Sequence, residues 1–223
     1  MALIELACLD MAGTTVRDDG AVERAFTVAA GAVGIVPGSR AFAAAMAIVH
    51  ETMGQAKIEV LRRILGEEET AQRANRAFES AYADLLSGGV VTALPGAVET
   101  LTALRECGIK VCLTTGFAPT TRDALLASLG WKPLVDLALS PADAGRGRPW
   151  PDMIHLAAHT LAVTDPAAIA VAGDTPSDIA AGRAAGASVV AGVLTGNGTR
   201  DELAAAGATH VLATITELPA LLT

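Results

Sequence analysis

The chain has 223 residues, enough to bury a sizeable core within one or two domains. Apolar residues make up 52% and charged residues 18%, which excludes a disordered chain, and no run approaches the roughly 18 apolar residues of a membrane-spanning helix. The net charge of −8 and the 3% aromatic content argue against a nucleic-acid-binding groove.

The sequence opens on an apolar run from Leu3 to Leu9, which we predict to be a buried strand. No basic segment precedes it, so we expect no secretion signal. Three cysteines without a Cys-x-x-Cys pair favour reduced thiols over a disulfide framework or a zinc site, and Cys8 is then a small core residue. Together these features predict a cytoplasmic protein.

A helical block without strand signals follows the first strand. Its segment 57–65 spaces apolar residues as an amphipathic helix does. Because the block is too long for one connection between strands, we predict a helical cap domain over residues 18–89, inserted into a core domain of residues 1–17 and 90–223. Hinges are expected at both ends of the insertion, at residues 17–20 and at the pair Gly88-Gly89. The alternative is that all the helices pack into one body.

Beyond the insertion, short apolar runs alternate with longer stretches of helical pattern. The runs predict strands at residues 108–114, 134–139, 168–173, 187–194 and 209–212. Helices are expected to start near residues 120, 151 and 177, with a last one over 217–222. This alternation is typical of a doubly wound α/β fold, in which helices cover both faces of a parallel sheet.

Polar residues follow the predicted strands where each strand ends. These segments are Asp10–Thr15, Thr114–Phe117, Gly145–Pro149 and Gly173–Asp178. A single aspartate in such a place is usually a helix cap. Because ligands of open α/β sheets bind beyond the carboxyl ends of the strands, four such segments at one edge predict a shared site.

The side chains of these segments suit phosphoryl transfer. Asp10 is a candidate nucleophile and metal ligand, and Asp174 can join it around Mg²⁺. Asp178, one helical turn later, can support Asp174 or accept from metal-bound water. The Thr115 hydroxyl and nearby backbone N–H groups can hold a phosphoryl oxygen, and Arg148 offers a planar fork for two. The metal and Arg148 would offset the repulsion between Asp10 and a phosphorylated substrate.

This set of motifs resembles the haloacid dehalogenase superfamily over nearly the whole chain. The motifs Asp10-x-Ala-Gly-Thr-Thr, Thr-Thr-Gly and Gly-Arg-Pro, with Met-Gly-x-x-Lys in the cap, are similar to those of its phosphonoacetaldehyde hydrolase (phosphonatase) branch. The resemblance implies a small phosphonate or phosphate substrate, a Schiff base on Lys57, and Mg²⁺ held by Asp10, Asp174 and the Ala12 carbonyl. It also implies substrate contacts from Thr14, Met53, Gly54, Gly116 and Phe117.

Ala12 and Lys57 fit one mechanism. Most phosphatases of this superfamily carry an aspartate in place of Ala12, which protonates the leaving group, and a lysine in place of Arg148. A phosphate ester leaves as an alkoxide and needs that acid, whereas a carbon–phosphorus bond leaves a carbanion, which an adjacent iminium turns into an enamine. Lys57 would supply the iminium, provided that burial lowers its pKa. The alternative is a solvated lysine, although the chain has only three lysines.

Three polar groups of phosphonatase are replaced here: its histidine by Val60, its tyrosine by Phe117 and its cysteine by Gly20. We therefore predict cleavage of a 2-oxoalkylphosphonate of another shape than phosphonoacetaldehyde, through an aspartyl-phosphate and a lysine Schiff base. The first alternative is a phosphatase of small phosphomonoesters such as phosphoglycolate, with Lys57 as a substrate contact. A dehalogenase and a signalling receiver fit less well, because the first lacks the acidic pair and the second lacks an inserted cap.

Other segments carry weaker signals. The glycine-rich run 192–198 lacks the spacing of a dinucleotide-binding loop and is interpreted as a late loop at the sheet edge. Arg146 is either a second cation near the substrate or a solvated loop residue, and Thr14 either contacts the phosphoryl group or caps the following segment. His50 is interpreted as an ordinary cap-helix residue. Apolar cap helices would support a homodimer, and no nucleic-acid or membrane partner is expected.

Overall fold

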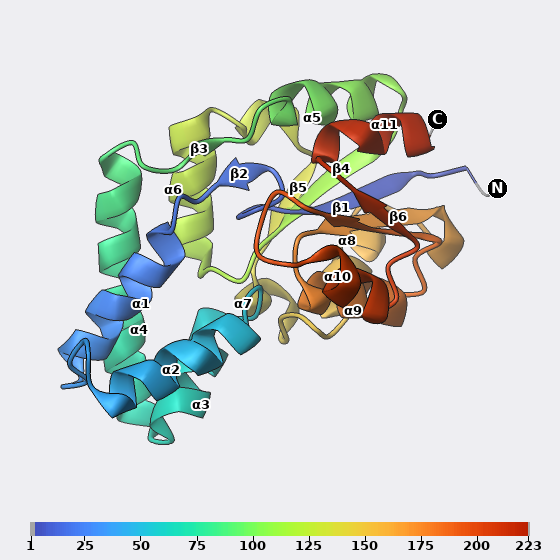
Figure 1. The fold of residues 1–223 in the computed structure, drawn as a ribbon. Coiled ribbons are helices and arrows are strands. Elements are labelled where there is room, and N and C mark those ends of the chain that lie inside the picture. Colours follow the sequence, from blue (N-terminus) through green and yellow to red (C-terminus); the bar gives the residue numbers. More distant parts are fainter. Residues whose placement is uncertain (1–2, 223) are drawn as a thin grey trace.

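The computed structural model describes residues 3–222 and has a parallel six-stranded sheet at its centre (Figure 1). The strands lie in the order β5-β4-β1-β6-β7-β8. Their bounds are Leu6–Asp10 (β1), Lys110–Thr114 (β4), Leu137–Leu139 (β5), Ile169–Gly173 (β6), Val189–Val193 (β7) and His210–Leu212 (β8). The chain adds β4 and β5 on one side of β1 and then β6, β7 and β8 on the other, which confirms the doubly wound fold.

Helices cover both faces of this sheet. Ala7 and Leu9 of β1 pack into one apolar cluster with residues of α5 and α6, whereas Leu6 and Cys8 pack into a second cluster with residues of α8 and α9. This two-sided burial explains why the strands are continuous apolar runs. The helices are Ala97–Glu106 (α5), Pro119–Leu129 (α6), Pro141–Ala144 (α7), Asp152–Thr160 (α8), Pro176–Ala184 (α9), Arg200–Ala205 (α10) and Leu218–Leu222 (α11), with short 3₁₀ turns at Lys132–Leu134, Pro166–Ala168 and Ile215–Glu217.

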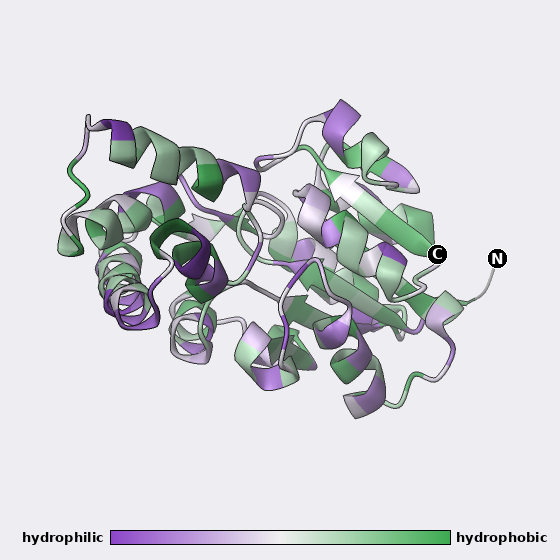
Figure 2. Ribbon diagram, turned by 90° about the horizontal axis from the view of Figure 1, so that it is seen from below, coloured by the Kyte–Doolittle hydropathy of each residue, from purple (hydrophilic) through white to green (hydrophobic). Residues whose placement is uncertain are grey.

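Four more helices form a layer beside the carboxyl edge of the sheet. They are Ala21–Ala32 (α1), Arg40–Glu51 (α2), Lys57–Leu65 (α3) and Glu68–Ser87 (α4). The Phe26 ring of α1 packs against the Phe78 ring of α4, with ring centres 4.7 Å apart. In Figure 2 the strands are mainly hydrophobic, whereas the helices carry both hydrophobic and hydrophilic residues. Within residues 3–222, no helix combines the length and the apolar character needed to cross a membrane.

A short two-stranded ribbon connects these four helices to the sheet. Strand β2 (Val16–Arg17) pairs with the antiparallel strand β3 (Thr92–Ala93), so that Val16 faces Ala93 and Arg17 faces Thr92. The sequence placed the hinges at residues 17–20 and 88–89, whereas β2 ends at Arg17, the first residue of one stretch, and β3 begins three residues after the other. Strands of two residues are too short to show an alternating pattern, and the sequence therefore did not predict the ribbon.

The helical layer also contacts the loops at the sheet edge. The Lys57 N–H donates to the Gly116 carbonyl over 3.2 Å, and the Thr121 hydroxyl donates to Glu79 of α4. A Cβ atom at position 116 would lie 2.3 Å from the Gln55 carbonyl oxygen, so this close approach requires glycine. The segment before α3 thus lies directly on the loop after β4.

Candidate active site

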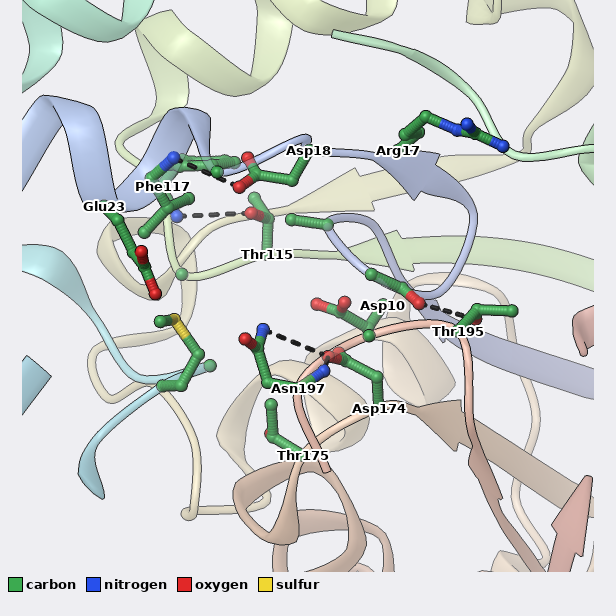
Figure 3. Close-up of a pocket in the computed structure, with 18 of the residues that line it drawn as sticks. Asp10, Arg17, Asp18, Glu23, Thr115, Phe117, Asp174, Thr175, Thr195 and Asn197 are labelled. Carbon is green, nitrogen blue, oxygen red and sulfur yellow. Dashed lines mark hydrogen bonds between the residues drawn. The ribbon is translucent and has the colours of Figure 1, made fainter. Parts of the chain in front are cut away.

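The loops that follow four strands and α7 converge on one cavity of about 550 Å³ (Figure 3). Asp10 ends β1, Thr115 follows β4, Arg148 follows α7 and Asp174 follows β6, and all four line the cavity. The structure thus brings together the residues that the sequence placed after separate strands. The reason is topological, since parallel strands present their carboxyl ends at one edge.

Three buried carboxylates lie at the floor of the cavity. Asp10, Asp174 and Asp178 each offer an oxygen within 4.8 Å of the other two. Burial raises the pKa of Asp10 to about 6, although Arg148 opposes the shift. Burial together with the charges of Asp10 and Asp178 raises the pKa of Asp174 to about 8. The protein therefore leaves negative charge here incompletely compensated, and a hard divalent cation fits such a donor set.

The loop after β7 holds Asp174 in place. The backbone N–H of Asn197 donates to Asp174 Oδ2 over 2.7 Å, and the Gly198 N–H donates to the Asp174 carbonyl over 2.8 Å. A Cβ atom at Gly196 would lie 1.9 Å from Asp174 Oδ2, so the loop passes this close only because glycine stands there. Thr195 and Asn197 were missed as cavity residues, although their position after a strand end could have identified them.

Arg148 joins two of the carboxylates through a single nitrogen. Its Nη1 donates to Asp10 Oδ1 over 2.6 Å and also to Asp178. Its Nε and Nη2 are buried and have no hydrogen-bond partner among the described residues. Buried guanidinium nitrogens without a hydrogen bond lower the stability of the fold. Two such donors beside a cavity are suited to binding the oxygens of a phosphoryl group. The fork for phosphoryl oxygens stays a prediction, and one nitrogen of the guanidinium is already used by the protein.

Asp178 lies behind the cavity wall rather than in it. Its Oδ2 accepts from the Thr175 N–H over 3.1 Å and from the Thr175 hydroxyl over 2.5 Å, which completes a capping box at the start of α9. Its other oxygen accepts from Arg148. The carboxylate therefore fixes both the helix and the guanidinium, in addition to adding charge near Asp174.

Lys57 extends from the first turn of α3 into the same cavity. Lys57 is only 6% exposed, and its Nζ lies 5.3 Å from the centre of the Phe117 ring and 5.9 Å from the centre of the Phe26 ring. Burial, followed by the positive charge of Arg148, lowers its pKa to about 8. The shift has the direction and the cause that the sequence argument requires, because a Schiff base forms from the neutral amine.

The remaining predicted contacts divide into two groups. Met53, Gly54 and Gly116 line the cavity, as does Phe117, whose ring also packs against Tyr82 of α4 at 4.4 Å between centres. Thr14 is fully buried outside the lining, and its hydroxyl donates to Asp174 over 3.5 Å. Its place in the structure is thus behind a candidate metal ligand, away from the space that a substrate would occupy.

Ala12 lines the cavity with a carbonyl that accepts no hydrogen bond within residues 3–222, so this oxygen is available to a cation.

Two other residues considered in the sequence lie outside the cavity lining. Arg146 pairs with Asp152 at 2.8 Å and stacks on Trp150 at 4.4 Å. His50 contacts Glu23 at 3.5 Å with both side chains about half exposed. Arg146 is therefore the solvated loop residue of the two alternatives.

One part of the cavity wall on the cap side was not predicted from the sequence. It comes from the linker and the start of α1, and its members are Arg17, Asp18, Asp19, Gly20, Val22 and Glu23, with Leu94 beside them. A run of charged residues of this kind usually forms a solvent-exposed face. No local sequence feature distinguishes the residues whose side chains line the cavity from those exposed to solvent.

We expect Mg²⁺ to stabilise the wild type. At about 100 times its Kd it would add about 2.7 kcal/mol, which corresponds to roughly 5–10 °C in Tm for a chain of this size. Asp174→Asn should lose most of this shift in a thermal melt, because a buried carboxylate of the cluster is removed. Asp201→Asn, an equal charge change on exposed α10, should retain it. An equal shift in both variants would contradict a metal site at Asp174.

Comparison with known proteins is consistent with this arrangement. The family model for haloacid dehalogenase-like hydrolases matches residues 4–186. A phosphonoacetaldehyde hydrolase of Bacteroides fragilis is 33% identical over 152 residues, which cover 58% of this chain and 58% of that protein. The matched region thus spans little more than half the length of that relative.

Solved structures resemble the chain over nearly its whole length. A phosphonoacetaldehyde hydrolase-like protein from Oleispira antarctica superposes with a TM-score of 0.83 at 26% identity, covering 98% of this chain and 91% of that one. A predicted phosphoglycolate phosphatase from Haemophilus somnus gives the same TM-score at 19% identity, with complete coverage of both chains. The second likeness concerns the fold alone.

Proposed function

The chain belongs to the haloacid dehalogenase-like hydrolases, and from this premise we propose that it cleaves the carbon–phosphorus bond of a 2-oxoalkylphosphonate. The observation that carries the proposal is the buried amine of Lys57 in the cavity that also holds Asp10. An ester phosphatase has no need of a nucleophilic amine there, whereas a carbonyl phosphonate offers the amine a reaction partner.

In this proposal Asp10 is the nucleophile at phosphorus. One carboxylate oxygen attacks the phosphonate, an aspartyl-phosphate forms, and water then releases inorganic phosphate. The free Nε and Nη2 of Arg148 hold phosphoryl oxygens, together with Thr115 and the backbone around Gly116. A Mg²⁺ ion held by Asp10, Asp174 and the Ala12 carbonyl would supply positive charge beside the phosphoryl group.

Lys57 acts on the carbon side of the bond that breaks. Its neutral amine condenses with the substrate carbonyl, and the protonated imine then accepts the electron pair of the carbon–phosphorus bond as an enamine. Ala12 supports this assignment, because a carbon leaving group stabilised in this way does not need the acid that an alkoxide needs. The Phe26 and Phe117 rings keep the amine away from bulk water.

We also propose that residues 18–89 act as the cap of this site. The segment from Met53 to Lys57 lies on the Gly116 loop and thereby limits access of water to the reacting groups. The homodimer through the cap helices stays a prediction, with Val28 and Val36 among the exposed apolar residues of the cap.

A phosphatase of small phosphomonoesters is the second candidate. The observation that favours it is that the Lys57 Nζ makes no hydrogen bond with the described residues, so it can also contact a carboxylate or hydroxyl of an ester substrate. In that case Asp10, Arg148 and Asp174 would serve the same phosphoryl steps.

Reductive trapping tests the proposal. Borohydride added with phosphonoacetaldehyde or a longer 2-oxoalkylphosphonate is expected to inactivate the wild type and to add the mass of the reduced adduct to Lys57. Phosphate release from a panel of phosphonates and phosphate esters is measured in parallel. Absence of an adduct with every oxoalkylphosphonate, together with turnover of simple esters, would favour the phosphatase.

A further inference from the structure

Asp18 carries a buried carboxylate oxygen that the fold leaves unused. The residue follows β2 at the start of the cap-side wall, and its Oδ2 accepts from the Val22 N–H over 3.1 Å. Its Oδ1 is buried and has no hydrogen-bond partner within residues 3–222. A buried acceptor without a partner destabilises a fold, so its presence calls for a use outside structural stability.

The amine of Lys57 is a cationic group in the same cavity as Asp18. Both residues line the same cavity, and in Figure 3 Asp18 and Phe117 lie above Asp10 and Asp174. Among the carboxylates that favour the charged amine, Asp18 has a larger effect on the pKa of Lys57 than Asp10 or Asp174 has.

Tyr82 of α4 interacts with the Asp18 carboxylate. Its hydroxyl is buried without a hydrogen bond of ordinary length, and burial, the Asp18 charge and a weak hydrogen bond with Asp18 raise its pKa. Burial also raises the pKa of Asp18, which brings this carboxyl nearer to the range where it can accept and return a proton. The titratable and charged groups around the pair are Glu79 and Tyr82 of α4, Arg24 of α1, Arg148, Asp10 and Asp174.

We propose that Asp18 is the positioning residue of Lys57 and accepts its proton during imine formation, a role that rests on the function proposed above. The Lys57 ammonium gives one proton to Asp18, and the neutral nitrogen bonds to the carbonyl carbon as the C=O π electrons move to oxygen. One N–H proton then passes to that oxygen. The hydroxyl leaves as water with the proton that Asp18 returns, which yields the protonated imine and regenerates the carboxylate.

No ion pair joins Asp18 and Lys57 directly in the described part of the chain, so the transfer requires a side-chain rotation or one bridging water. The two effects of Asp18 on the amine have opposite consequences. As a nearby negative charge it holds the amine protonated, whereas as a proton acceptor it generates the nucleophile. A substitution that removes the charge therefore separates the two roles.

Asp18→Asn is compared with Asp201→Asn as a matched control. Asn keeps the acceptor for the Val22 N–H, and Asp201 is exposed on α10, outside the cavity lining. Thermal melts establish that both variants fold. The first readout is the pH dependence of Lys57 acetylation without substrate, followed by peptide mass. The second is the rate of borohydride-trapped adduct formation with phosphonoacetaldehyde or a longer 2-oxoalkylphosphonate at pH 7.

We expect Asp18→Asn to shift the acetylation midpoint to lower pH and to slow adduct formation by about 10-fold or more, while Asp201→Asn matches the wild type. An adduct rate that stays equal or rises in Asp18→Asn overturns the proton-acceptor role. Identical acetylation profiles in the two variants overturn the coupling to Lys57. If the wild type itself forms no adduct, the proposed function fails and with it the proton transfer, whereas the acetylation profile still decides whether Asp18 acts on Lys57.

Discussion

Asp10→Asn is expected to reduce phosphate release by about 10⁴-fold or more, because the amide has no anionic oxygen to attack phosphorus. The substitution keeps the size of the side chain at the end of β1, so the Arg148 guanidinium retains Asp178 as a partner. The rate is measured as phosphate release at saturating substrate with Mg²⁺. Retention of more than a tenth of the wild-type rate would exclude Asp10 as the nucleophile.

The same variant has an expected effect on stability. The pKa of Asp10 is raised from 3.8 to about 6, so the folded state holds its proton more tightly than the unfolded state. The stability of the wild type in metal-free buffer therefore falls as pH rises through this window. Asp10→Asn removes this dependence, and its Tm at pH 7 without Mg²⁺ should equal or exceed that of the wild type. A large drop in Tm would indicate that the loss of activity reflects unfolding.

The core of the site was predictable because one rule of topology suffices for it. Asp10, Thr115 and Asp174 each follow a buried apolar run, and in a parallel sheet such positions meet whatever the details of packing. The same rule covers Asn197 after β7, which the glycine-rich composition of its loop concealed. The position of Asn197 after a strand was therefore visible in the sequence, but it was not interpreted as a site position.

The wall formed by the linker and the start of α1 was not predictable in the same way. Asp18 and Asp19 are adjacent acids with the same local pattern, yet Asp18 has a buried oxygen and Asp19 is exposed. Phe117 was predicted as a substrate contact, and the structure shows in addition that it packs against Phe78 and Tyr82 from a distant helix. Such packing depends on how two separate chain segments meet, which no local periodicity encodes.

Three substitutions of Lys57 separate covalent from electrostatic roles. Lys57→Arg keeps a positive charge but has no amine that forms an imine, and Lys57→Met keeps an apolar stem between the Phe26 and Phe117 rings. Both, like Lys57→Ala, should reduce cleavage of a 2-oxoalkylphosphonate by about 10³-fold or more. Hydrolysis of a simple phosphate ester should change by less than about 10-fold, because Asp10 and Arg148 remain.

Lys110→Arg is the control, since Lys110 Nζ donates to the Leu161 carbonyl and lies outside the cavity lining. Cleavage of the phosphonate at an undiminished rate by Lys57→Arg would show that charge alone is needed and would favour the phosphatase.

Stability gives an independent check on the same lysine. The pKa of Lys57 falls from 10.5 to about 8 on folding, so the protonated amine destabilises the folded state below pH 8 and this cost disappears as pH rises toward 10.5. Lys57→Met is therefore expected to raise Tm at pH 7 and to lose this advantage in alkaline buffer. A pH-independent change in Tm would mean that the amine is not held in the buried site. In that case the enzyme would lack the neutral nucleophile on which carbon–phosphorus cleavage depends.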